Sequence, residues 1–162
     1  MQPVLVLQLL VLVAVANATP VFAKKILGGA FAWPLDGGSV FTDGRPLLGA
    51  SKTIRGVLLS VLVTSLAAVL VGLGEQVGLV VALSAMAGDV ASSFVKRRLG
   101  LPPSSMALGL DQVPEGLFPL LAVRLLLPVT IVDIVVGTAV FFAGSLVISR
   151  ILFKLNVRDE PY

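Results

Sequence analysis

Residues 56–98 read GVLLSVLVTSLAAVLVGLGEQVGLVVALSAMAGDVASSFVKRR, and this stretch decides the class of fold. It contains two apolar runs, about 56–73 and 77–95, with only a short turn around Glu75 between them. Each run is long enough for a helix that crosses a hydrocarbon core about 30 Å thick. The tight connection predicts that the two helices are antiparallel neighbours.

The rest of the chain is apolar in the same way. Of its 162 residues, 57% are hydrophobic and 13% are charged, and the mean hydropathy is +1.04. A soluble domain has only about 45–50% apolar residues. We therefore predict one all-α integral membrane domain over residues 1–162, with about five transmembrane helices and two polar cytoplasmic loops. Besides the two helices above, the predicted elements are helices at about 3–22, 115–133 and 136–153 and loops at about 23–55 and 96–114.

The first and fourth helices each raise a question. A cleavable signal peptide carries positive charge before its apolar stretch, whereas here Lys24 and Lys25 follow it. This order favours a retained helix over a signal peptide. In the fourth run, Pro119 and Pro128 are expected to bend the helix, which neighbouring helices in a membrane can tolerate.

The distribution of charge predicts an orientation. Cytoplasmic segments of membrane proteins carry an excess of lysine and arginine. With the N-terminus outside and the C-terminus in the cytoplasm, the outer turns hold only Glu75 and Asp133, and Arg124 and Arg150 are the basic exceptions. The cytoplasmic basic residues are then Lys24, Lys25, Arg45, Lys52, Arg55, Lys96, Arg97, Arg98, Lys154 and Arg158.

The composition limits the chemistry. The chain has no cysteine and no histidine, so thiolate sites and imidazole catalysis are excluded. The remaining ligands are carboxylates, hydroxyls and backbone oxygens, which suit a hard cation such as Mg²⁺ better than zinc or a redox metal.

The first candidate site is the segment 34–56, PLDGGSVFTDGRPLLGASKTIRG. Its glycines let backbone amides approach an anion closely. A solvated connector with Asp-Gly turns is the alternative, but a connector does not need so many charges of both signs. We favour a functional loop, whose candidate residues are Asp36, Asp43, Arg45, Lys52, Thr53 and Arg55.

The second candidate lies at the end of the third helix. Asp89, Ser92, Ser93 and Lys96 are spaced i, i+3, i+4 and i+7, which places them on one helix face. Asp89 then lies roughly 10 Å from the basic cluster. Ionisable residues in membrane spans are functional candidates by default, although an ion pair between Asp89 and Arg124 would also explain the charge.

Two nearby features have structural alternatives. The cluster Lys96–Arg98 could anchor the helix end to anionic headgroups. Asp111 and Glu115 stand at the entry to the fourth helix, where acids favour the helix dipole. All three candidate regions nevertheless lie on the same predicted side of the membrane, which favours a common site.

Long ordered motifs resemble the CDP-archaeol synthases, membrane cytidylyltransferases related to the phosphatidate cytidylyltransferases. The similarity covers most of the chain after the first helix. The motifs that carry it are Asp36-Gly37, Phe41-Thr-Asp43-Gly44-Arg45, Leu48-Gly-Ala-Ser-Lys52-Thr53-Ile-Arg55-Gly56, Gly88-Asp89-Val-Ala-Ser-Ser93-Phe94-Val-Lys96-Arg97-Arg98-Leu-Gly100 and Asp111-Gln112.

The resemblance implies transfer of CMP from CTP to 2,3-bis-O-geranylgeranylglycerol 1-phosphate, with Mg²⁺ as cofactor and pyrophosphate released. The partners would be CTP, the isoprenoid ether-lipid phosphate and membrane lipids, with no nucleic acid. Asp89 and Asp111 would be metal ligands and, with Lys96 and Arg97, catalytic residues. By the same resemblance the nucleotide would be bound by Asp43, Arg45, Lys52, Thr53, Arg55, Lys96 and Arg97.

One position departs from the family pattern. A second acid is expected three residues after Asp111-Gln112, but Pro114 stands there and Glu115 follows. The lack of histidine agrees with the ether-lipid branch, because the relatives that act on phosphatidate carry a histidine-glycine motif. Two other classes remain open: a small transporter or channel with Asp89, Arg124 and Asp133 along its path, and a scaffold that only holds anionic lipid.

Overall fold

The computed structural model describes residues 2–157, and over this range the chain forms helices and no β-strand. The all-α class predicted from the sequence is confirmed. Arg158, counted above among the cytoplasmic basic residues, lies outside the described range. The helices are α1 (Pro3–Leu27), α2 (Ile54–Leu70), α3 (Glu75–Arg98), α4 (Gln112–Ala122) and α5 (Ile131–Lys154), with a 3₁₀ turn, η1 (Val123–Leu125), after α4.

Three of these helices are long and apolar enough to cross a membrane. They are α1, α3 and α5, with 25, 24 and 24 residues. Helix α2 has 17 residues, which is the lower end of the spanning range. Helix α4 has 11 residues, and its length of about 16 Å cannot cross the hydrocarbon core alone.

The predicted fourth and fifth helices have the wrong bounds. The expected helix 115–133 ends at Ala122 and passes into η1, and Pro128 disfavours a helical residue before it. Thr130 then caps α5: its hydroxyl accepts a hydrogen bond from Asp133 N (3.2 Å), and the Asp133 carboxylate accepts one from Thr130 N (3.0 Å). Helix α5 therefore begins at Ile131, five residues before the predicted start at 136.

The other helices extend past their predicted ends. Helix α1 continues to Leu27, so Lys24 and Lys25 form its last turn, where cations favour the helix dipole. Helix α3 includes Glu75 at its start and Lys96–Arg98 at its end. Both basic clusters are therefore helical rather than part of the loops predicted from the sequence.

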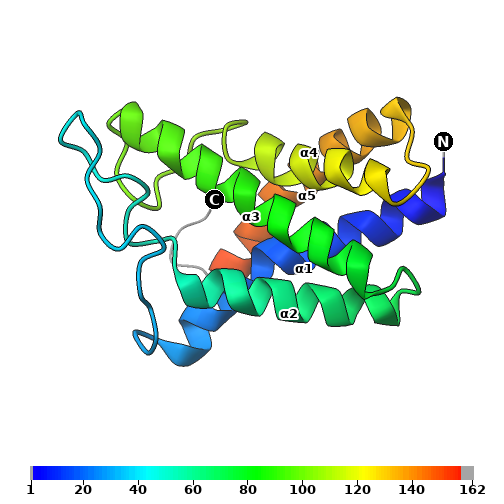
Figure 1. The fold of residues 1–162 in the computed structure, drawn as a ribbon, viewed down its shortest axis with the longest axis horizontal. Helices are drawn as coiled ribbons and strands as arrows, with labels where there is room; N and C mark the ends of the chain where they lie inside the picture. Colours follow the sequence, from blue (N-terminus) through cyan, green and yellow to red (C-terminus); the bar gives the residue numbers. More distant parts are fainter. Residues whose placement is uncertain (1, 158–162) are drawn as a thin grey trace.

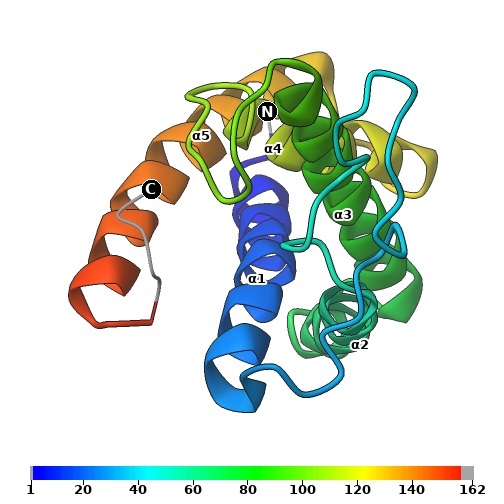
Figure 2. The same ribbon diagram turned by 90° about the vertical axis from the view of Figure 1, so that its left-hand side faces the viewer.

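Both long polar loops lie at one end of the helices. Figure 1 shows loops 28–53 and 99–111 together at the left, whereas the short connections 71–74 and 126–130 lie at the right. We call the left side the loop end. Seen from that end in Figure 2, α1 lies in the middle of the molecule, and it contacts each of the other four α-helices. Its fully buried side chains include Leu9, Leu12, Val13 and Ala16.

Two glycines bring α3 close to its neighbours. A Cβ atom on Gly78 would lie 2.5 Å from Ser65 Cα on α2. A Cβ atom on Gly88 would overlap the backbone of Pro114 and lie 2.9 Å from Glu115 N on α4. Small residues allow such close helix crossings in membrane proteins. The second crossing is directly beside Asp89, and so it shapes the polar site.

Candidate functional site

The centre of the polar site is an ion pair between the first loop and α3. Lys52 Nζ lies 2.5 Å from Asp89 Oδ1, and the two side chains are 19% and 22% exposed. Burial alone would lower the pKa of the Lys52 ammonium, but the Asp89 carboxylate outweighs it and holds the pKa above its ordinary value. Lys52 therefore carries its charge at neutral pH. Asp89 pairs with Lys52 rather than with Arg124, the partner considered above.

A third ionisable group joins this pair from α4. The carboxyl group of Glu115 forms a side-chain hydrogen bond with Asp89 and interacts electrostatically with Lys52. The missing side chain at Gly88 permits this contact, because α4 begins against the backbone of α3 at that point. Two carboxyl groups and one ammonium group thus share the centre. The sequence placed Glu115 only at a helix entry and did not show that it reaches Asp89.

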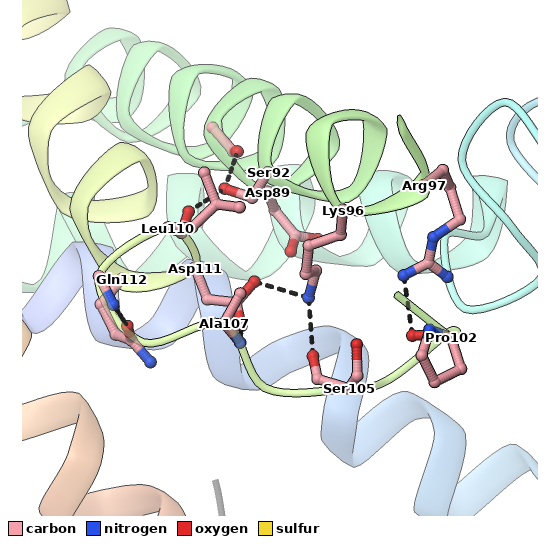
Figure 3. A network of polar contacts seen from close by, with 12 residues as sticks. Asp89, Ser92, Lys96, Arg97, Pro102, Ser105, Ala107, Leu110, Asp111 and Gln112 are labelled. Atoms are coloured by element: carbon pink, nitrogen blue, oxygen red, sulfur yellow. Dashed lines mark hydrogen bonds and ion pairs between the residues drawn. The ribbon is translucent and has the colours of Figure 1, made fainter. Parts of the chain in front are cut away.

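The second polar loop is fastened to α3 by a parallel set of contacts (Figure 3). Lys96 Nζ lies 2.6 Å from Asp111 Oδ1 and donates to Ser105 O at 3.0 Å. The other carboxylate oxygen of Asp111 accepts from Ala107 N at 2.9 Å. The hydroxyl of Ser92 lies 2.7 Å from Leu110 O and can donate to it. Asp111 therefore holds the loop and makes no side-chain capping bond to α4.

Arg97 is buried with part of its guanidinium group unsatisfied. Its side chain is 3% exposed, and Nη2 donates to Pro102 O at 2.8 Å. Nε and Nη1 have no hydrogen-bond partner. Gly49, with φ +92°, lies beside Nη1: a Cβ there would be 3.5 Å away. An adjoining hollow of about 290 Å³ is lined by Arg45, Pro46, Arg97, Gly100, Leu101, Pro102 and Pro103.

Asp43 and Arg45 lie outside this centre and attach the first loop to the end of α3. Arg98 pairs with Asp43 at 2.5 Å and its guanidinium carbon lies 4.6 Å from the centre of the Phe41 ring. Arg45 donates to Arg98 O at 2.5 Å. Arg98 is thus held by the protein, as are Lys96 and Arg97, so headgroup anchoring does not describe this cluster.

The other two nucleotide-binding candidates make structural contacts. Thr53 caps α2, since its hydroxyl accepts a hydrogen bond from Gly56 N at 3.1 Å. The buried Arg55 donates to the carbonyl oxygens of Gly28 (3.1 Å) and Ala30. Both residues hold the Lys52 segment in place from the α2 side.

Asp36 organises the first loop from within. Its carboxylate accepts hydrogen bonds from Leu48 N (2.8 Å), Gly49 N (3.1 Å) and Gly38 N (2.9 Å). Partial burial alone would raise the pKa of this carboxyl group, but these N–H groups lower it below its ordinary value. The loop is therefore a built structure and not only a solvated connector.

Substitution Asp36→Asn is expected to loosen the first loop without unfolding the helices. The amide loses the charge that strengthens the three bonds, so hydrogen exchange at Leu48 and Gly49 should accelerate by about tenfold. In the unchanged protein the same protection should be lost in acid, as the pH falls through the lowered pKa of Asp36. Unchanged exchange would show that other contacts hold the loop. Glu75→Gln, at the start of α3, is the control.

Among residues 2–157, the three side chains of the transporter alternative do not line one path. Asp89 belongs to the loop-end site, Arg124 is exposed in η1, and Asp133 accepts a hydrogen bond from Gln2 N at 2.9 Å and also caps α5. The three side chains considered for a path are thus divided between the two ends of the molecule. The ion pairs among the described residues lie at the loop end.

The helices and their polar site define an integral membrane protein with lysine, arginine and carboxyl side chains gathered at one end of its helices. The family model described as CarS-like, CDP-archaeol synthase, matches residues 3–162. This chain belongs to the CDP-archaeol synthase family.

Individual relatives agree with this assignment. CDP-archaeol synthases of Pyrococcus furiosus and Aeropyrum pernix are 42% and 47% identical over 107 and 105 residues, and these segments span 60% and 57% of those relatives. The CDP-archaeol synthase of Sulfurisphaera tokodaii is 30% identical over 91% of this chain and 89% of its own.

A solved structure is also similar. It is described as an intramembrane enzyme for archaeal membrane lipids biosynthesis, with 37% sequence identity and a TM-score of 0.72. The match covers 86% of this chain and 89% of that one.

Proposed function

We propose that this chain transfers CMP from CTP to an isoprenoid ether-lipid phosphate, 2,3-bis-O-geranylgeranylglycerol 1-phosphate, and releases pyrophosphate. The observation that carries the proposal is the gathering of Lys52, Asp89 and Glu115 beside the Lys96–Asp111 pair at the loop end. The proposed reaction is that of the family to which the chain belongs. The lysine and carboxyl groups of the site suit the phosphate groups and the cation that this reaction uses.

The carboxyl groups fit a magnesium ion. No group of three acids among the described residues is arranged to hold a metal. Magnesium in nucleotide sites is usually held by one or two carboxylates together with substrate phosphates. Asp89 and Asp111 are the ligands implied by the family resemblance, and Glu115 adds a carboxyl group in contact with Asp89. When bound, Mg²⁺ would neutralise phosphate charge and assist departure of pyrophosphate.

Arg97 offers a site for the phosphates of CTP. Its Nε and Nη1 atoms are buried and unpaired, and such groups are costly unless a partner satisfies them. Arginine and phosphate form strong bidentate hydrogen bonds. Lys96 lies between Asp111 and Arg97 in Figure 3, and Lys52 pairs with Asp89, so both lysines add positive charge near the carboxyl groups. We assign the triphosphate to the region between Arg97 and these lysines.

The reaction needs little proton transfer. An oxygen of the ionised lipid phosphate attacks the α-phosphorus of CTP, and the bond from that phosphorus to the β-phosphate oxygen breaks. Pyrophosphate leaves with the electron pair, so no general base is required. The residues of this chain act by position and charge: Lys52, Lys96 and Arg97 reduce the repulsion between two anions.

The loop end is then the cytoplasmic side, because CTP is a cytoplasmic nucleotide and the basic residues collect there. Both termini would lie as the sequence predicts, with the N-terminus outside and the C-terminus in the cytoplasm. Proteolysis of inverted and right-side-out vesicles would test this: a cut in loop 28–53 from the outer face would contradict it.

The activity can be tested directly. Purified protein is incubated with CTP, Mg²⁺ and the lipid phosphate in detergent or vesicles, and CDP-lipid and pyrophosphate are measured. Both products should appear in equal amounts and should depend on the cation. Absence of product across lipid conditions, in a protein that remains folded, would reject the proposed function.

A further inference from the structure

The end of α1 and the loop after it expose an unusual concentration of large apolar side chains. Helix α1 ends with Lys24 and Lys25 in its last turn, the point where an apolar span normally gives way to water. After these two lysines, Ile26 is 77% exposed, Phe31 68% and Trp33 65%. A loop lying wholly in water would not gather such side chains. We call residues 26–33 the aromatic segment.

The composition of this segment suits a membrane surface. Tryptophan is favoured at the boundary between hydrocarbon and water, and phenylalanine adds apolar surface that can enter the bilayer beside it. Phe31 and Trp33 contact each other edge to face, with ring centres 6.2 Å apart, and so present a joint apolar tip. The adjacent lysines of α1 favour anionic headgroups over neutral ones.

The aromatic segment is also bonded to the residues that carry Lys52. Ile54 N donates to Trp33 O at 3.0 Å, and Leu35 N donates to Lys52 O at 2.7 Å. Pro34 and Thr53 form the bridge between these two bonds. The position of the aromatic tip therefore fixes the backbone on which Lys52 extends to Asp89.

Arg55, the next residue of α2 after Ile54, bonds to an earlier part of the segment. Its buried guanidinium group donates to Gly28 O and Ala30 O, the carbonyls that follow the end of α1. The segment is thus tied to the start of α2 at two places, at Gly28 and Ala30 and again at Trp33. It would move as one piece with the Lys52 backbone and not as a free loop.

We propose that the aromatic segment rests in the headgroup layer of an anionic bilayer and thereby holds Lys52 at the level of the lipid phosphate. The contact of the aromatic segment with the bilayer does not depend on the proposed function. The effect on the lipid phosphate does depend on the proposed function. Lys52 would then be positioned by the membrane surface itself, through the hydrogen bonds between Trp33–Leu35 and Lys52–Ile54.

The chain has a single tryptophan, so fluorescence reports on Trp33 alone. The full chain is placed in nanodiscs of mixed phosphatidylglycerol and phosphatidylcholine, with bromine atoms at a shallow or a deep position of the acyl chains. Shallow bromine should quench Trp33 more strongly than deep bromine, and acrylamide should quench it weakly. Quenching by acrylamide without quenching by bromine would place Trp33 in water and overturn the proposal. Equal bromine quenching in pure phosphatidylcholine would overturn the preference for anionic lipid.

The positioning effect has its own readout. The double substitution Phe31→Ser, Trp33→Ser should raise KM for the lipid phosphate by about tenfold and leave KM for CTP unchanged. Leu70→Ser, also strongly exposed at 88% but at the other end of α2, is the matched control. Equal rises in both KM values, or none, would reject the positioning role. If neither the unchanged protein nor any variant shows activity, the proposed function is rejected. The quenching experiment still tests the contact with the bilayer.

Discussion

Substitution Asp89→Asn is expected to abolish measurable CMP transfer, a loss on the order of 10³ or more in kcat. The amide keeps the shape of the side chain and removes its charge. Lys52, 2.5 Å away, loses its partner, and Glu115 loses the carboxylate that it contacts. A cation at this point would lose one of its ligands, so the substitution reaches every component of the proposed site.

Loss of folding is the alternative reason for lost activity, and it can be separated. Breaking a fully buried ion pair costs about 3–5 kcal/mol. The cost here should be smaller, because the two side chains are 19% and 22% exposed. The variant should remain monodisperse, with a thermal midpoint lower by a few degrees. Ser84→Ala, whose hydroxyl bonds only to carbonyls of its own helix, is the control on α3. Retained activity in the Asp89 variant would make Asp89 structural.

The long apolar runs were enough to predict the class of fold, and local signals explain where the bounds failed. The two helices and the turn predicted over residues 56–98 are found as α2, the connection 71–74 and α3, because length and hydropathy determine a spanning helix. The break between α4 and α5 was predicted too late in the chain, at 134–135, although the sequence contains the signal for its true position: Thr130 and Asp133 have the spacing of a capping box, just after Pro128. Pro128 was interpreted as a bend within one helix, a common effect of proline in membranes, whereas here it precedes a new helix.

In the same way, part of the candidate site could be predicted from the sequence and part could not. Spacing on one helix predicted that Asp89, Ser92 and Lys96 share a face, since helical geometry fixes that relation. The pairing of Lys52 with Asp89 joins residues 37 positions apart and depends on how a loop returns to a helix. Arg55 shows the opposite case: it neighbours Lys52 in sequence but turns toward Gly28. Charge type alone could not distinguish these two orientations.

Glu115 was the residue that sequence spacing left unassigned, and Gly88 explains why. No acid stands three residues after Asp111-Gln112, and Glu115 comes one position later. One position turns a side chain by about 100° on a helix. Glu115 nevertheless reaches Asp89, because α4 starts directly against the backbone at Gly88. The close approach of two helices thus brings a displaced acid to the site.

Substitution Gly88→Ala is therefore expected to damage both stability and activity. The new methyl group would overlap the backbone of Pro114 and come within 2.9 Å of Glu115 N, and backbone atoms cannot move aside as a flexible side chain could. Overpacking of this kind costs about 1–3 kcal/mol. Helix α4 must shift away from α3, and the carboxyl group of Glu115 shifts with it. Thermal unfolding and CMP transfer, measured on the same preparation, should both fall.

Gly144→Ala on α5 gives the matched comparison, because nothing lies within 4 Å of the position that its Cβ would take. There the same chemical change should stabilise the helix by about 0.5–1 kcal/mol, since alanine has less backbone freedom to lose. Two identical substitutions are thus expected to shift the thermal midpoint in opposite directions. If Gly88→Ala keeps its stability but loses activity, the contact between Glu115 and Asp89 matters for the reaction and not for the fold. If it keeps both, the prediction is wrong: α4 accommodates the methyl group without losing the contact between Glu115 and Asp89.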